Sequence, residues 1–95
     1  MSTTLGLLHL EFRIAGAQSL KDKRRSVKSF KDRLAARRNV SVAEVEAQDD
    51  HRRAVVAVAM VGSDRRYVEG ALQQIVNEAV AYRDMVLVEH DVEWL

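Results

Sequence analysis

The chain has 95 residues, of which 47% are hydrophobic, and a formal net charge of +1, as expected of one small domain with a single core over residues 1–95. It contains no Cys, only three His and no apolar run near the roughly 18 residues of a membrane span, which excludes disulfide, thiolate and membrane-spanning classes and leaves little material for a metal site. Met1 to Thr4 lack the basic and apolar regions of a signal peptide, so we expect a cytoplasmic protein. Because the chain has no Cys and only three His, we expect no cofactor.

The first half of the chain predicts a strand followed by a helix. Residues 5–14 alternate apolar and polar side chains with the period of two of a half-buried strand. Gly16 ends this run, and Ser19 with Asp22 three positions later forms a helix N-cap with an acidic residue at the capping-box position. We predict a helix from Ser19 to Asn39, whose apolar face consists of Leu20, Val27, Phe30 and Leu34.

The second half predicts three strands and a second helix. Residues 39–46 have the broken alternation of an edge strand with a bulge, and residues 54–61 are apolar at almost every position, as in a central strand. After an N-cap at Asp64, apolar residues recur at helical spacing up to Ala79. Residues 85–94 form the last strand, with Val86, Val88, Val92 and Trp94 expected on one face and Glu89, Asp91 and Glu93 on the other.

The order βαββαβ predicts an α+β, ferredoxin-like fold: a four-stranded antiparallel sheet with both helices on one face, in the order fourth, first, third, second strand. We further expect the first and third strands to be parallel neighbours, which would place the starts of both helices at the same edge of the sheet. Both faces of residues 54–61 are apolar, and two helices cover only one. We therefore expect a second copy of the chain to cover the other face in a homodimer.

The charge is strongly uneven along the chain. Between Ser19 and Arg38 nine basic residues face two acidic ones, a local balance of +7, so the remainder carries −6. Cations in a first helical turn oppose the helix macrodipole, and a phosphate would relieve that repulsion. The alternative is that the long side chains spread into solvent while Asp22 and Asp64 compensate the dipoles. The candidate anion- or nucleic-acid-binding residues are Lys21, Lys23, Arg24, Arg25, Lys28, Lys31, Arg65 and Arg66.

Three segments carry a resemblance to a known family: Ser-Leu-Lys-Asp-Lys-Arg-Arg at 19–25, Asn-Val-Ser-Val-Ala-Glu-Val at 39–45 and Val-Gly-Ser-Asp-Arg-Arg at 61–66. In their order and spacing the chain resembles the YlxP family of small bacterial proteins, a domain of unknown function, over nearly its whole length. The resemblance implies a ferredoxin-like fold and, in many bacteria, a gene among those for translation initiation and ribosome maturation factors. It implies no catalytic residues.

The leading hypothesis is a non-enzymatic module that binds the ribosome or other structured RNA. Four cations of the predicted helix recur at intervals of three, four and three and form a ridge that can follow a phosphate backbone: Lys21, Arg24, Lys28 and Lys31. Sequence reading by base stacking is disfavoured because residues 52–61 contain no aromatic side chain.

Two other classes compete with RNA binding. Acylphosphatases share this size and strand order, which suggests an enzyme acting on a small phosphorylated substrate, although residues 15–19 lack the Gly-rich loop with Arg that those enzymes use. A ligand-sensing or oligomeric module is the third hypothesis. A metal site at the acidic row 89–93 is disfavoured, because alternate strand residues lie roughly 6.5 to 7 Å apart.

Overall fold

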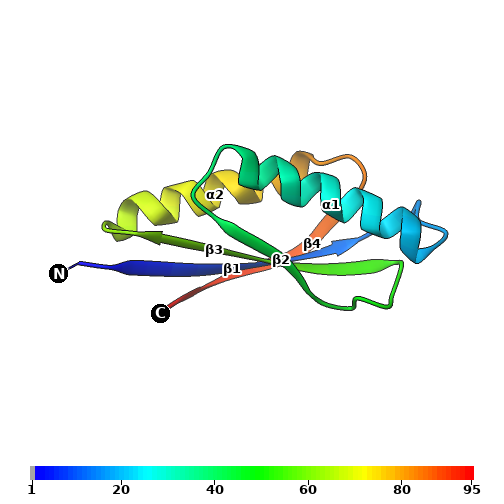
Figure 1. The fold of residues 1–95 in the computed structure, drawn as a ribbon, viewed down its shortest axis with the longest axis horizontal. Helices are drawn as coiled ribbons and strands as arrows, with labels where there is room; N and C mark the ends of the chain where they lie inside the picture. Colours follow the sequence, from blue (N-terminus) through cyan, green and yellow to red (C-terminus); the bar gives the residue numbers. More distant parts are fainter. Residues whose placement is uncertain (1) are drawn as a thin grey trace.

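The predicted element order is confirmed by a computed structural model, which describes residues 2–95. The elements are β1 (Thr4–Arg13), α1 (Leu20–Ala36), β2 (Ser41–Glu46), β3 (Arg53–Gly62), α2 (Arg65–Ala81) and β4 (Val86–Trp94). Both helices cover the same face of the sheet, so the molecule has two layers (Figure 1). No helix within residues 2–95 is long and apolar enough to cross a membrane.

The sheet has the predicted order, β2-β3-β1-β4, and all three strand pairs are antiparallel. This is the ferredoxin-like arrangement. The expectation that β1 and β3 are parallel is wrong: Thr4 lies opposite Gly62 and Arg13 opposite Arg53. A short hairpin joins β2 to β3 and makes them antiparallel, while the crossover through α1 makes β1 parallel to β2, so β3 between them runs against both.

This antiparallel pairing determines where each helix begins. α1 follows the end of β1 and α2 follows the end of β3, and these strand ends lie at opposite ends of the sheet. The two helices therefore start at opposite ends of the molecule and run antiparallel to each other (Figure 1). The expectation that both helix starts converge on one edge is wrong for the same reason.

Both helix starts are capped as predicted. The Ser19 hydroxyl accepts a hydrogen bond from the Asp22 N–H (3.1 Å), and the Asp64 carboxylate accepts one from the Arg66 N–H (3.1 Å). α1 ends at Ala36, three residues before the predicted Asn39. The Asn39 side chain instead donates to the carbonyl oxygen of Val61 (3.0 Å), outside the helix.

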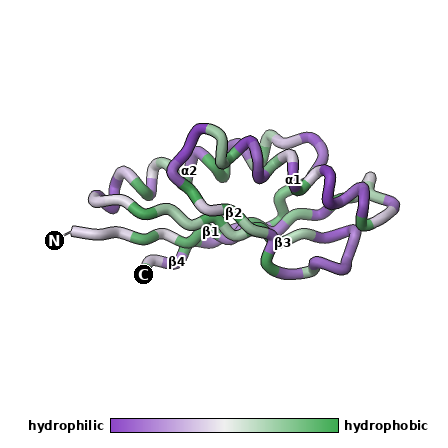
Figure 2. Tube along the Cα trace, viewed as in Figure 1, coloured by the Kyte–Doolittle hydropathy of each residue, from purple (hydrophilic) through white to green (hydrophobic). Residues whose placement is uncertain are grey.

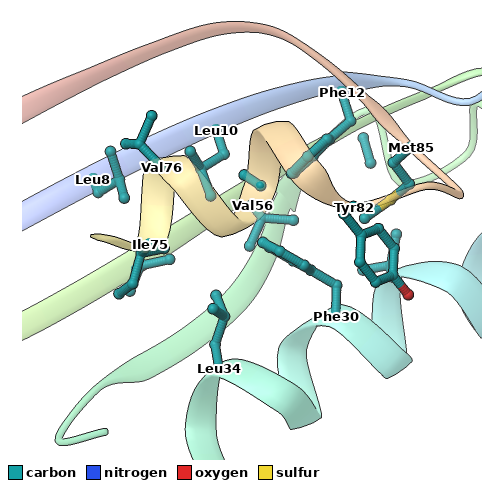
Figure 3. Packing of buried hydrophobic residues seen from close by; sticks show 14 of the residues in the cluster. Leu8, Leu10, Phe12, Phe30, Leu34, Val56, Ile75, Val76, Tyr82 and Met85 are labelled. Carbon is teal, nitrogen blue, oxygen red and sulfur yellow. The ribbon is translucent and has the colours of Figure 1, made fainter. Parts of the chain in front are cut away.

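The core lies between the sheet and the helices. Of the apolar residues predicted for one face of α1, Val27, Phe30 and Leu34 meet alternate residues of β1 and β3 in the core, whereas Leu20 is half-buried and lies outside it. Figure 2 shows the contrast between the largely hydrophobic strands and the hydrophilic outer turns of α1. At its centre the Phe30 ring packs edge-on against Phe12 and Tyr82, with centroids 5.2 Å apart in both pairs (Figure 3). α2 lies close to the sheet at Gly6, where a Cβ atom would be only 2.8 Å from Leu72 Cδ1.

Two bulges interrupt the sheet. The bulge predicted in β2 is confirmed by a register shift between Glu44 and Glu46. A second shift, opposite Glu11 and Phe12 of β1, leaves Val88 of β4 outside the ladder. The face prediction for β4 therefore holds only after the bulge. Val92 and Trp94 do lie on the helix side, but before the bulge Leu87 packs against the core, whereas Val86 and Val88 are exposed.

Candidate nucleic-acid interface

The outward side of α1 carries most of the predicted cations. Lys21, Arg24, Arg25 and Lys28 are exposed and Lys31 is half-buried; we call these five residues the basic surface of α1. Lys28 Nζ pairs with Asp32 Oδ2 at 2.6 Å, but at this exposure such a pair contributes only about 0.3–0.5 kcal/mol. For the other four, no carboxylate of residues 2–95 lies within ion-pair distance. The basic surface of α1 therefore keeps most of its charge unpaired.

Lys23 does not belong to that surface. Its side chain is fully buried, and its Nζ donates to the carbonyl oxygens of Ala47 (2.6 Å), Gln48 (3.4 Å) and Arg53 (3.1 Å) in and beside the β2–β3 loop. Glu44 Oε2 lies 2.8 Å from the same nitrogen. This contact is an ion pair without hydrogen-bond alignment, since the Glu44 oxygen has no hydrogen-bond partner among the described residues. The prediction that Lys23 contacts an external anion is contradicted by this burial.

The sequence contained a signal for the burial of Lys23. It lies three residues after Leu20 and four before Val27, which places it on the apolar face of α1. A lysine at such a position must bury its ammonium group or bend it out to solvent. Here four oxygen atoms from β2, β3 and the loop between them surround the buried ammonium group.

Arg65 and Arg66 lie at the far end of the sheet from the start of α1. A strand of ten residues, roughly 30 Å long, separates the two helix starts. Both side chains are exposed, and the Arg65 guanidinium lies over the Trp94 ring, 4.3 Å from its centroid. The structure therefore does not bring these two arginines together with the basic surface of α1.

A different cation does lie beside the start of α1. Arg83 follows α2, and the antiparallel helices bring the end of α2 to the end of the sheet where α1 begins. Arg83 and Arg25 line one depression of about 390 Å³, which Asp22 and Asp84 line as well. A second depression of about 390 Å³ is lined by Arg83 and Arg33. Sequence reasoning missed Arg83 because it assumed parallel central strands; the correct topology would have found it.

The helix starts themselves are not free anion sites. Besides the caps already described, Asp22 Oδ2 accepts a hydrogen bond from the Gln18 N–H (3.2 Å) and brings its negative charge to the first turn of α1. At this turn the structure therefore favours the alternative in which Asp22 compensates the helix dipole, and not the one in which a bound phosphate relieves the repulsion between the cations and the dipole. Anion binding by α1 must therefore use its side chains.

The opposite face of the molecule is acidic. We call the side of the sheet away from the helices the open face; the register places five carboxylates on it, from Glu11, Glu46, Glu89, Asp91 and Glu93. Glu11 Oε2 accepts a hydrogen bond from Arg53 Nε (2.8 Å), which lowers the pKa of Glu11 and raises the pKa of Arg53. Nowhere in residues 2–95 is a group of three His, Asp or Glu placed to hold a metal ion. The open face repels phosphate, whereas the basic surface of α1 attracts it.

The aromatic side chains do not offer a stacking platform on the sheet. Within the described strands, the open face carries no aromatic residue. Tyr82 is buried and its hydroxyl donates to the Ser26 carbonyl oxygen (3.2 Å), as expected of a packing residue with a polar tip. Tyr67, by contrast, is 71% exposed on α2.

Comparison with known proteins gives a family and a fold. The family model described as "Protein of unknown function (DUF503)" matches residues 5–92, and no curated protein matches the chain. The de novo designed protein Foldit4 is 14% identical with a TM-score of 0.58, covering 99% of this chain and 97% of its own. SnoaB, a cofactor-independent oxygenase from Streptomyces nogalater, is 14% identical with a TM-score of 0.57, and the match covers 97% of this chain and 92% of the SnoaB chain.

A third similar structure is a C-terminal segment of the alpha subunit of aIF2 from Pyrococcus abyssi. It is 14% identical with a TM-score of 0.54, and the match covers all of this chain but only 51% of that one. At identities this low, the three likenesses show a shared ferredoxin-like fold and nothing about activity.

Proposed function

We propose that this chain, which belongs to the DUF503 family of proteins of unknown function, is a non-enzymatic module that binds structured RNA through the basic surface of α1. The observation that carries the proposal is the unpaired charge on one side of a helix. Lys21, Arg24, Arg25 and Lys31 have no carboxylate partner within residues 2–95, and the only partner of Lys28 is the exposed Asp32.

The geometry of the ridge suits a polyanion better than a single ion. From Lys21 to Lys31 the helix rises about 15 Å, so the cations are spread along a line and not gathered into a pocket. Long flexible cations on such a line contact successive phosphates, and each contact releases a counterion. The acidic open face orients the protein so that the helix side approaches the nucleic acid.

Recognition is expected to depend on shape and phosphate positions. The open face, where RNA-recognition motifs stack bases, has no aromatic residue in the described strands and carries five carboxylates. Phosphate contacts fix position without reading base identity. The preferred ligand is therefore a folded RNA whose backbone presents a ridge or groove to α1.

The ribosome is the proposed source of that RNA. The resemblance to the YlxP family supports this assignment, because genes of that family lie among those for translation initiation and ribosome maturation factors. Ribosomal RNA is the most abundant structured RNA that a cytoplasmic protein meets. Cytoplasmic location and the YlxP identity are parts of the same proposal.

An enzyme acting on small phosphorylated substrates is the weaker alternative. Its site would be the depression at the start of α1, where Arg25 and Arg83 could hold a phosphate. Asp22 and Asp84 line the same depression and balance the two arginines, so its formal charge is zero. The unbalanced charge lies outside that depression, along the helix.

The proposal is tested by binding of the purified protein to ribosomal subunits and to an unrelated RNA hairpin at two salt concentrations. Replacing Lys21, Arg24 or Lys28 singly by Ala should weaken binding to both RNAs by a similar factor and reduce the slope of log K against log salt by roughly 0.7 to 0.9. The proposal fails if the parent does not bind RNA at low salt, or if a folded triple variant binds as the parent does.

A further inference from the structure

β4 is an edge strand whose outer side is open. It is the last strand of the sheet, and of its nine residues only Leu87 and Trp94 are half-buried while the rest are exposed. The other edge, β2, has six residues, is interrupted by its bulge and is tied to α1 through Glu44. An open edge presents unpaired backbone N–H and C=O groups that can pair with another strand.

The hydrogen-bond alternation identifies the free backbone groups of β4. The Leu95 N–H donates to the Leu5 carbonyl oxygen (3.0 Å), one residue beyond the pair of Gly6 and Trp94, so these two residues continue the register. In an antiparallel pair such bonded positions alternate, so Asp91 and Glu93 also point their backbone groups toward β1. The backbone N–H and C=O groups of His90 and Val92 point away from β1, toward the open edge.

A partly apolar groove runs beside this edge on the helix side. Between α2 and β4 there is a depression of about 250 Å³, whose apolar lining consists of Leu72, Val76, Val92 and Trp94 and whose polar lining consists of Arg65, Glu69, Gln73 and His90. Val92 is 37% exposed, and Trp94 is half-buried beneath the Arg65 guanidinium. A strand added beside β4 would direct every second side chain into this groove.

An acidic row runs along the same edge on the open face. Glu89, Asp91 and Glu93 point to that side and lie opposite Glu11, His9 and Leu7 of β1. Within the part of the chain that the structure describes, none of the three forms an ion pair. The remaining side chains of an added strand, about 4.8 Å away, would lie next to these carboxylates.

We propose that β4 binds an extended segment of a partner protein as a fifth, outermost strand, in which basic residues alternate with apolar ones. The basic residues pair with Glu89, Asp91 and Glu93, and the apolar residues fill the groove between α2 and β4. Edge pairing with a second copy of this chain is disfavoured, because it would place two acidic rows side by side. This site is separate from the basic surface of α1 and does not depend on RNA binding.

The test uses a peptide of alternating Lys and Val, with an alternating Glu and Val peptide as control. Trp94 is the only tryptophan of the chain, so its fluorescence reports directly on the groove. The Lys and Val peptide should change that fluorescence saturably and slow amide hydrogen exchange at His90 and Val92. Exchange at Asp91 and Glu93, whose N–H groups already face β1, should change less. A peptide N-methylated along the edge that faces β4 should not bind.

Two double variants that remove the same charge distinguish strand addition at β4 from electrostatic attraction of the peptide to the protein's overall negative charges. Glu89→Gln with Glu93→Gln should weaken peptide binding roughly 2- to 30-fold, as expected for two lost cross-strand charge pairs. Asp49→Asn with Asp84→Asn removes the same charge from exposed loops and should have less than a twofold effect. The proposal is overturned if both variants weaken binding equally, if the N-methylated peptide binds as well, or if the Lys and Val peptide does not bind at millimolar concentration.

Discussion

Replacing Lys23 by Met is expected to destabilise the fold by about 3–5 kcal/mol, even though Lys23 lies in a helix whose other cations are mostly exposed. The Lys23 Nζ donates hydrogen bonds to three carbonyl oxygens, and Glu44 Oε2 lies 2.8 Å from it. Met fills similar space but leaves the Glu44 carboxylate, only 14% exposed, without its cation. The loss of one partner from a buried ion pair is therefore the main part of the cost.

The hydrogen bonds that the three carbonyl oxygens lose account for the upper part of the expected loss of stability. A buried acceptor left without a donor costs about 1–3 kcal/mol. Two of the three carbonyls belong to Ala47 and Gln48 at the start of the β2–β3 loop, which can move and admit water, so these costs are not expected to add in full. Lys23 also joins the first turn of α1 to this loop, and its loss should loosen both.

Urea denaturation of Lys23→Met and of Lys21→Met tests this reasoning. Lys21 lies in the same turn but is exposed, so its variant should stay within about 0.5 kcal/mol of the parent. For a domain of this size 3 kcal/mol also corresponds to a fall in Tm of at least about 12 °C. Adding Glu44→Met to Lys23→Met should recover part of the stability, because no buried charge then remains unpaired. A Lys23→Met variant as stable as Lys21→Met would refute the reasoning.

Three further predictions concern stability and assembly. Gly70→Ala in α2 should stabilise the fold by about 1 kcal/mol in thermal unfolding, because Ala has a higher helix propensity than Gly and the new Cβ would meet nothing beyond its own stretch of helix within 4 Å; an unchanged Tm would contradict this. Arg53 lowers the pKa of Glu11, so their pair stabilises the fold above about pH 4.3 and is lost as pH falls through the lower folded-state pKa. Glu11→Gln should therefore flatten the dependence of the urea midpoint on pH below that value; parallel curves would show that the pair contributes nothing. The homodimer proposed from the sequence would bury Val61, which is 53% exposed on the open face, but it would also bring the carboxylates of two open faces together; a sedimentation mass of 10.7 kDa at high micromolar concentration would exclude it.

The sequence patterns located the elements but not their directions. Periods of two and 3.6 reflect which side chains are buried, and that is why all six elements and the caps at Ser19 and Asp64 could be predicted. An alternating pattern reads the same in both directions, so it could not show how β1 and β3 are oriented. The short connection between β2 and β3 carried that information. The wrong orientation moved Arg65 into the candidate site and left Arg83 out of it.

The candidate site could be predicted only in part for a related reason. Charge was taken as a sign of exposure, which holds for Lys21 and Arg24 but not for Lys23. The groups that make burial of Lys23 tolerable lie 21 to 30 residues further along the chain, at Glu44, Ala47, Gln48 and Arg53. Only the folded hairpin brings them to α1. The extra residue at Val88 likewise depends on pairing with β1 and has no counterpart in the periodicity of β4.

The proposal that α1 binds RNA is tested most directly by the salt dependence of RNA binding for two charge-matched double variants. Lys21→Gln with Arg24→Gln removes two cations from the basic surface of α1, and Arg65→Gln with Arg66→Gln removes two from the far end of the sheet. The first should reduce the slope of log K against log salt by roughly 1.4 to 1.8, and the second should leave the slope of the parent unchanged. Equal losses in the two variants would contradict the proposal, since they would show attraction by net charge alone.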